Sequence, residues 1–252
     1  MEIIDKDEAV FEWVNAGGLS PIVLVCEHAS NHIPPGLNGL GLSEADQKRH
    51  IAYDPGAAPV ARLLSKLLDA PLILQRVSRL VYDCNRPPES PGAMPELSEV
   101  FEIPGNKALS PDARLSRTLQ VYRPFHHALE VLLDERAAAQ RPSAMVSIHS
   151  FTRIYKGKKR DVDVGLLFDR DPWLANALVK SFPGVNTQLN EPYGPKDGVL
   201  HLLNLHAAPR SLHHLMIEIC NDILETERQQ QQWAQRLSVP LIQAAAKLGA
   251  KK

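Results

Sequence analysis

Titratable side chains follow or interrupt apolar runs at three points of this sequence. Glu27 and His28 come after the run IVLV and Cys26, His149 follows AMVSI, and Glu218 lies inside LMIEIC. A buried carboxylate needs a partner or a metal ion, because an unpaired buried charge is very costly. Two imidazoles and a carboxylate, with a further carboxylate held apart, are the composition of a catalytic zinc site. The non-ligand carboxylate of such a site acts as a general base.

The same residues also have simpler interpretations. A histidine at a strand end often has only a structural hydrogen bond, and Asp54, at the start of DPGAAPVARLL, could simply be a helix N-cap. Either Asp54 or Glu27 could supply the acidic ligand, because a twisted strand end can free both neighbours Glu27 and His28. No contiguous zinc motif such as HExxH is present.

Several other classes of chemistry lack their signatures. Cys26 and Ser150 adjoin the candidate residues, but the chain has no G-x-S-x-G elbow, G-x-G-x-x-G or P-loop. The net charge of -1 and the short basic runs give no footprint for nucleic acid. The densest run, KGKKR at residues 156–160, is expected to be a solvated loop.

The length and composition of the chain favour one soluble domain over residues 1–252. The composition is that of an ordinary globular protein, with 44% hydrophobic and 23% charged residues. No apolar stretch is long enough to span a bilayer, and the N-terminus lacks the features of a signal peptide. Three cysteines without C-x-x-C spacing indicate buried, reduced thiols. We therefore expect a cytoplasmic protein that is a monomer or a small homo-oligomer.

Strands and helices alternate along the chain, which predicts an α/β sheet with helices on both faces. In such sheets ligands bind beyond the carboxyl ends of the strands, where the titratable residues fall. A short amphipathic helix is expected at 5–16 and a long loop at 86–111. Strands are expected at 22–25, 72–75, 80–82, 144–150, 161–168, 184–189 and 213–222, and helices from 43, at 54–68, 112–139, 172–182 and 226–248.

Six sequence segments together resemble those of a known protein family. VCEHASNHIP, HIAYDPGA, SRLVYDCNRP, SIHSF, NEPYG and IEICND occur in this order between Ile22 and Leu224. Together they resemble the N-formylglutamate amidohydrolase family, and more closely its broad branch of predicted amidohydrolases. The resemblance implies a three-layer αβα hydrolase with a mixed twisted sheet, similar to zinc muramoyl amidases and, more distantly, zinc carboxypeptidases.

The resemblance also implies roles for individual residues. It makes His28, Asp54 and His149 the ligands of one Zn²⁺ per chain and Glu218 the general base. The implied reaction is hydrolysis of the amide bond of a small N-acyl amino acid such as N-formyl-L-glutamate. Alternatives are a zinc peptidase or amidase acting on another small substrate, and a binding protein that has lost the chemistry.

The chain departs from the pattern in ways that bear on the substrate. The formylglutamate enzymes resemble PHSG where this chain has Glu27 to Ser30, and they have an acidic residue where it has Ser147. Close relatives tend to have an aromatic residue and a histidine where this chain has Asp161 to Asp163.

Six polar residues are candidates for substrate binding. Arginine binds carboxylates through two hydrogen bonds, which suits Arg79 or Arg86, although Arg79 could instead pair with Asp83. Arg153 could reach the same pocket. Asn31 could orient an amide or cap a turn, and Asn85 lies next to Arg86 in the same loop. Adjacent residues on a helix do not share a face, so at most one of His126 and His127 can face the site. The resemblance favours His126 for substrate binding. The histidines at 127, 213 and 214 are expected at the surface.

Overall fold

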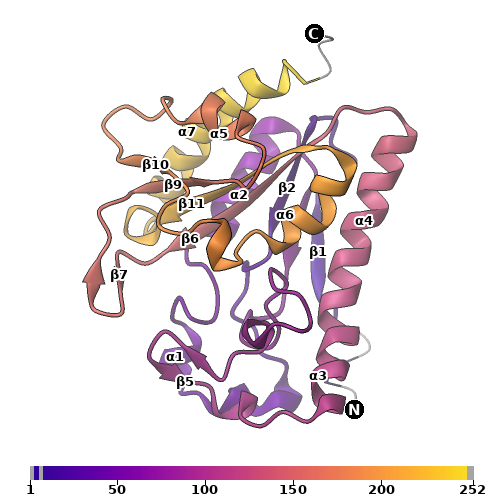
Figure 1. Cartoon of the computed structure of the whole chain (residues 1–252), viewed down its shortest axis with the longest axis vertical. Coiled ribbons are helices and arrows are strands. Elements are labelled where there is room, and N and C mark those ends of the chain that lie inside the picture. Colours follow the sequence, from indigo (N-terminus) through magenta and orange to yellow (C-terminus); the bar gives the residue numbers. More distant parts are fainter. Residues whose placement is uncertain (1–2, 6–7, 249–252) are drawn as a thin grey trace.

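A mixed seven-stranded sheet lies at the centre of the computed structural model, which describes residues 3–5 and 8–248 (Figure 1). Four central strands run parallel, the first strand in sequence is antiparallel to its neighbour, and the last pair runs antiparallel to the centre. The order across the sheet is β1 (Phe11–Val14), β3 (Leu72–Gln75), β2 (Ile22–Cys26), β6 (Ala144–Phe151), β11 (His213–Cys220), β9 (Val164–Leu167) and β10 (Thr187–Leu189).

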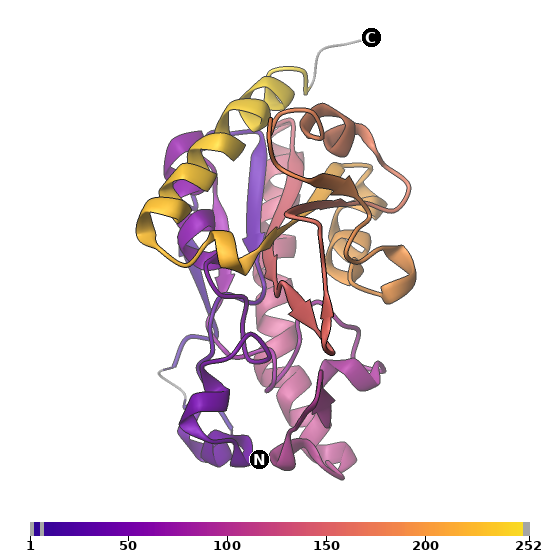
Figure 2. The same ribbon diagram turned by 90° about the vertical axis from the view of Figure 1, so that its left-hand side faces the viewer.

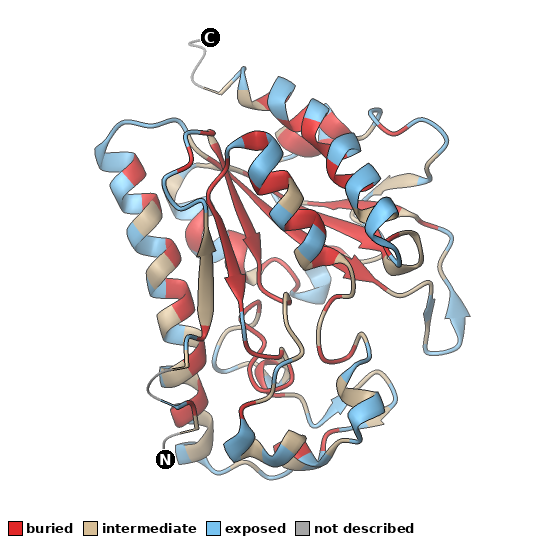
Figure 3. Ribbon diagram, turned by 180° about the vertical axis from the view of Figure 1, so that it is seen from behind, coloured by how far each residue is buried: buried red, intermediate tan, exposed pale blue. Residues whose placement is uncertain are grey.

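Helices cover both faces of the sheet and enclose two hydrophobic cores. Side chains alternate along β2, so that Ile22 and Leu24 face one core while Val23 and Val25 face the other. One face carries α2 (Ala57–Leu68), α5 (Trp173–Leu178) and α7 (Glu227–Ala245), of which α2 and α7 are seen in front in Figure 3. The other carries α4 (Arg123–Ala138) and α6 (His201–His206). This arrangement confirms the predicted three-layer αβα fold.

Irregular segments form a region beyond the carboxyl ends of the parallel strands, below the sheet in Figure 1. It contains α1 (Glu44–Gln47), α3 (Pro111–Arg117), the β4–β5 hairpin (Leu97–Ser98 and Phe101–Glu102) and the 3₁₀ turns η1 (Pro35–Gly41), η2 (Pro91–Ala93) and η3 (Pro104–Asn106). The hairpin of β7 (Ile154–Tyr155) and β8 (Lys158–Lys159) reaches down toward it in Figure 2. Further short turns are η5 (Pro195–Asp197), η6 (Ala208–Arg210) and η7 (Asn221–Ile223).

One carboxylate joins these segments. Glu99, in the turn of the β4–β5 hairpin, accepts a hydrogen bond from the backbone N of Lys156 at 2.8 Å. Its other oxygen lies 2.7 Å from Nε2 of His50. Three segments distant in sequence are therefore held together in front of the ends of the central strands.

Most of the predicted elements are present. Ser43 caps α1 as expected, and its hydroxyl accepts a hydrogen bond from the backbone N of Asp46. The long helix expected at 112–139 runs from α3 through a π-helical turn, η4 (Thr118–Tyr122), into α4. The strands around His149 and Glu218 also form, and both are buried along nearly their whole length.

Two predicted elements are wrong. The helix expected at 5–16 is a strand over Phe11–Val14, because Phe11 and Trp13 alternate with Glu12 and pack on the sheet core; residues 6 and 7 lie outside the described part of the chain. Residues 80–82 form a buried turn rather than a strand, and the hydroxyl of Ser78 accepts a hydrogen bond from the backbone N of Leu80. The β7–β8 hairpin occupies the segment expected to be a loop.

The cysteines and helices meet two further expectations. Cys26, Cys84 and Cys220 are free and buried. Among the described residues, no helix has the length and apolar character needed to cross a bilayer.

Candidate active site

Four chain segments bring the candidate residues to one edge of the sheet. β2 ends at Cys26, so that Glu27 and His28 follow it directly. His149 on β6 and Glu218 on β11 are Cα partners in the parallel register. Asp54 precedes α2, and its backbone N donates to the carbonyl oxygen of His28 at 2.9 Å.

A glycine permits this close approach of α2. Gly56, the N-cap of α2, has φ +81°, and a Cβ there would lie 2.5 Å from the Cβ of Leu224. Only glycine satisfies both the left-handed backbone and this contact. The DPG sequence therefore sets the position of the Asp54 carboxylate.

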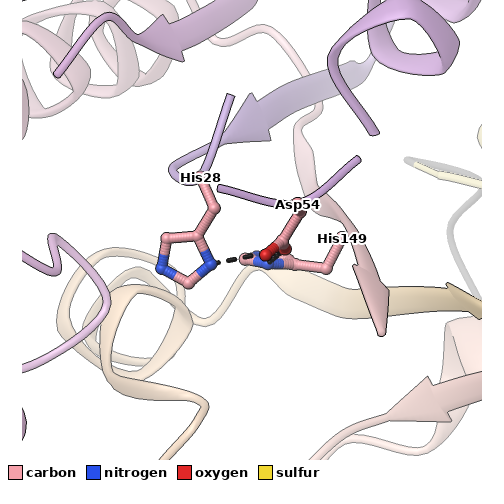
Figure 4. A group of neighbouring side chains, drawn as sticks. All are labelled: His28, Asp54 and His149. Carbon is pink, nitrogen blue, oxygen red and sulfur yellow. Dashed lines mark hydrogen bonds and ion pairs between the residues drawn. The ribbon is translucent and has the colours of Figure 1, made fainter. Parts of the chain in front are cut away.

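His28, Asp54 and His149 point toward one another (Figure 4). Oδ2 of Asp54 lies 2.8 Å from Nδ1 of His149 and 3.3 Å from Nδ1 of His28. One potential ligand atom from each residue lies within 4.8 Å of the other two, and all three residues are buried. Two imidazole nitrogens and one carboxylate oxygen match the donor set of a catalytic zinc site. Among the described residues, no other group of three such side chains meets this criterion.

The far nitrogens of both rings contact further carboxylates. Nε2 of His28 lies 2.8 Å from Oδ1 of Asp83, and Nε2 of His149 lies 3.0 Å from Oε2 of Glu27. Ionised carboxylates only accept hydrogen bonds, so each Nε2 carries the proton and donates. Histidines that bind metals commonly hold their second ring nitrogen in this way. Glu27, the alternative acidic ligand, thus contacts the side of His149 away from Asp54.

Opposite charges control the ionisation of the rings and carboxylates. Burial lowers the pKa of His149, but the carboxylates of Glu27 and Asp54 outweigh burial, and the pKa lies well above its usual value. Burial raises the pKa of Asp54, but His28 and His149 hold it below its usual range. Burial likewise opposes ionisation of Asp83, yet His28 and Arg79 keep its pKa well below normal.

Glu218 differs from the other carboxylates of the site. Burial raises its pKa to about 7. Its Oε2 is buried and has no hydrogen-bond partner among the described residues, while its neighbours Ile217 and Ile219 pack in the core on the opposite face. Glu218 can therefore accept a proton near neutral pH and is free to do so.

A cavity of about 160 Å³ opens onto these residues. Its lining includes His28, Asp54, His149 and Glu218, together with three of the residues predicted to bind substrate: Arg79, Asn85 and Arg86. Seven of the predicted site residues therefore line one cavity.

Arg79, Asn85 and Arg86 differ in the hydrogen bonds and ion pairs that they already form. Arg79 donates to Asp54 at 3.2 Å and to Asp83 at 2.8 Å, so the ion pair with Asp83 considered from the sequence is formed. The Asn85 side chain donates to the carbonyl oxygen of Val199 and accepts from the backbone N of Leu202. Within the described part of the chain, Arg86 forms no ion pair; one of its Nη atoms donates to the carbonyl oxygen of Asn85.

The other three candidates lie outside the cavity lining. Asn31 donates to the carbonyl oxygen of Gln47, and Arg153 pairs with Asp163 and Asp222. His126 stacks on His206 behind the site. Their substrate contacts remain predictions. The expectation that His214 lies at the surface is wrong, because it is buried on β11 and hydrogen-bonds the carbonyl oxygen of Leu212.

Sequence reasoning missed several residues of the cavity wall. They are His50, Glu99, Tyr155 and Tyr193. Tyr193 lies inside the NEPYG segment that carried the family resemblance. His50 opens HIAYDPGA, another of those segments, whereas Glu99 and Tyr155 come from a hairpin turn and a short strand whose sequences have no signature.

Comparison with known proteins agrees with this site. A family model described as N-formylglutamate amidohydrolase matches residues 20–224. The chain belongs to the N-formylglutamate amidohydrolase family. Its matched part includes His28, Asp54, His149 and Glu218, and the family is one of amidohydrolases. The predicted membership is thereby confirmed.

Two crystal structures resemble the chain over nearly its full length. A gene product from Agrobacterium tumefaciens is 44% identical, with a TM-score of 0.95 covering 98% of this chain and 99% of the other. N-formylglutamate amidohydrolase from Ralstonia eutropha JMP134 is 17% identical, with a TM-score of 0.70 covering 96% and 98%. The second likeness shows that this family member shares the fold. No curated protein matches the sequence.

Proposed function

We propose that this protein is a zinc-dependent hydrolase that cleaves the amide bond of a small N-acyl amino acid, with N-formyl-L-glutamate as the first substrate to test. The observation that supports this most directly is the convergence of His28, Asp54 and His149 beside Glu218 at one cavity. Membership of a family of amidohydrolases supports the reaction type.

The residues fit a metal ion with an open position. Nδ1 of His28, a carboxylate oxygen of Asp54 and Nδ1 of His149 would hold it, since these atoms face one another while both Nε2 atoms are engaged elsewhere. A bound zinc ion would polarise a carbonyl oxygen and lower the pKa of a bound water to about 7.

The chain's own residues would handle the protons and the substrate. Glu218, with a pKa of about 7, would accept the proton of the attacking water and return it to the leaving amine. Arg86 would bind a substrate carboxylate, because Arg79 is already paired with Asp54 and Asp83. The cavity of about 160 Å³ suits a small substrate better than an extended peptide.

The test is metal content together with turnover of N-formyl-L-glutamate, followed by formate release. We expect about one zinc per chain, as for a mononuclear catalytic site. Glu218→Gln should retain the zinc and lose about 10²- to 10⁴-fold in kcat, the usual contribution of a general base. Glu102→Gln is the matched control, because Glu102 is exposed on β5, where it pairs with Lys107.

Two results would overturn the proposal. One is a wild-type protein that fails to bind added zinc. The other is a zinc-loaded Glu218→Gln variant that turns over as fast as Glu102→Gln. Activity on another N-acyl amino acid but not on N-formyl-L-glutamate would keep the reaction type and change the substrate.

A further inference from the structure

Glu27 is a buried carboxylate that contacts His149 and Ser147 through one of its two oxygens. The side chain is fully buried. Its Oε2 accepts hydrogen bonds from Nε2 of His149 at 3.0 Å and from Oγ of Ser147 at 2.6 Å. Its Oε1 is buried and has no hydrogen-bond partner in the described part of the chain. A buried carboxylate oxygen without a hydrogen bond costs free energy of folding. Glu27 is therefore expected to have a role other than stabilising the fold.

The contact determines which nitrogen of His149 faces the cavity. A neutral imidazole carries one proton, and the hydrogen bond made by one nitrogen decides which nitrogen is free to bind a metal. Because Oε2 of Glu27 needs a donor, the proton stays on Nε2. Nδ1 also faces a carboxylate, Oδ2 of Asp54, so without a metal both ring nitrogens are donors. A metal bound on the side of Asp54 and His28 would take the place of the Nδ1 proton, while Glu27 keeps the other proton on Nε2.

Ser147 fixes the carboxylate in turn. It lies two residues before His149 on β6, and both side chains therefore project from the same face of the strand. Its hydroxyl reaches the same oxygen of Glu27 that accepts from His149. Serine, carboxylate and imidazole thus form one chain of hydrogen bonds that ends at a proposed ligand atom.

We propose that Glu27 is a positioning residue that locks His149 in the tautomer and orientation needed to bind the metal through Nδ1. This rests on the proposed function, because it takes His149 to be a ligand. Asp83 makes the equivalent contact to Nε2 of His28 but also pairs with Arg79, whereas Glu27 contacts no cation other than His149 among the described residues. Glu27 is therefore the cleaner of the two contacts to test.

The first measurement is the zinc dissociation constant by competition with a chelator, on metal-free wild type, Glu27→Gln and Glu218→Gln. Removing such a contact to a ligand typically weakens metal binding by about 10- to 100-fold, which we expect for Glu27→Gln. Glu218→Gln is the matched control: the same change, at another buried carboxylate of the same sheet edge, without a hydrogen bond to a ligand ring. We expect it to weaken zinc binding less.

The second measurement reports the ring itself. In ¹⁵N-labelled, zinc-loaded wild type, the Nε2–H of His149 should give a downfield proton signal that exchanges slowly with solvent, and this signal should shift upfield or broaden in Glu27→Gln. A purely structural contribution of Glu27 would change the unfolding temperature of the metal-free protein without moving this signal or the affinity.

The outcomes separate this inference from the proposed function. If wild type binds zinc and hydrolyses an N-acyl amino acid while Glu27→Gln binds zinc equally well, the inference alone is wrong. If wild type binds no zinc, both fall together. Should Glu27→Gln not fold, Ser147→Ala replaces it, because it releases the carboxylate without removing the charge; an unchanged zinc affinity in that variant would also overturn the inference.

Discussion

Arg79 and Arg86 show how neighbouring cations of one cavity take different roles. Both line the cavity, but Arg79 pairs with two carboxylates of the site while Arg86 has no ion pair among the described residues. The sequence favoured Arg86 only slightly over Arg79, because the spacing of residues along a loop does not reveal which guanidinium is already paired. The structure therefore makes Arg86 the better candidate for a substrate carboxylate.

Replacing Arg86 with alanine is expected to raise KM for an N-acyl amino acid by about 10-fold or more, since a charge-assisted hydrogen bond contributes about 1.5–3 kcal/mol. Steady-state kinetics on zinc-loaded protein measures this. Arg49→Ala provides the control, because Arg49 is half exposed and pairs with Asp46 outside the cavity lining. Equal KM values for the two variants would assign the carboxylate contact to another residue.

At the scale of the elements, the sequence predicted the strands that carry the site much better than the segments that enclose it. Apolar runs fixed β2, β6 and β11, and these strands bring His149 and Glu218 into register. The β7–β8 hairpin and the turn at Glu99 could not be predicted, because they depend on contacts between segments about 50 residues apart. Likewise, the alternation of Phe11 and Trp13 is too short to separate a strand from a helix without the partner strand β3.

The contacts of Glu99 lead to a prediction about the cavity mouth. Glu99→Ala removes both the bond to the backbone N of Lys156 and the contact with His50. Amides of residues 152–160 should then exchange faster, by about 10-fold or more, because a hydrogen bond to a charged group contributes about 1.5–3 kcal/mol. Hydrogen–deuterium exchange with mass spectrometry measures this on the intact protein.

Glu102→Ala is the control for that experiment, since it lies on the same hairpin and faces solvent. If both variants protect residues 152–160 as well as wild type does, Glu99 does not hold the β7–β8 hairpin. If only Glu99→Ala loosens the hairpin and also changes KM, the hairpin forms part of the substrate site.

On the scale of the whole molecule, two neutral histidines lie between the helices of one layer. Nε2 of His126, on α4, donates to the carbonyl oxygen of Cys84 at 2.9 Å, so its Nδ1 accepts from Nε2 of His206, on α6, at 2.7 Å. Burial and the neighbouring His206 lower the pKa of His126 to about 3, and burial with Arg210 lowers the pKa of His206 to about 4. Charging His126 would place a proton on its Nδ1, against the Nε2–H of His206.

This pair should make the folded protein sensitive to acid. Both pKa values lie below the value of about 6.5 for an unfolded histidine, so between these limits the unfolded chain binds more protons than the native one. The stability contributed by the neutral pair is full above pH 6.5 and declines as the pH falls toward 4. The decline is up to about 1.4 kcal/mol per pH unit for each ring that titrates.

Urea unfolding at pH 7, 6 and 5 tests this with two histidine variants. His206→Gln keeps a donor toward His126 but cannot take up a proton, so it should lose less stability than wild type between pH 7 and 5. His127→Gln changes an exposed ring on α4, next to His126, and should follow wild type. The difference between variants isolates the pair, because the carboxylates and histidines of the site titrate in all three proteins. If His206→Gln and His127→Gln showed the same slope, the acid sensitivity of this fold would arise at the active site instead of between α4 and α6.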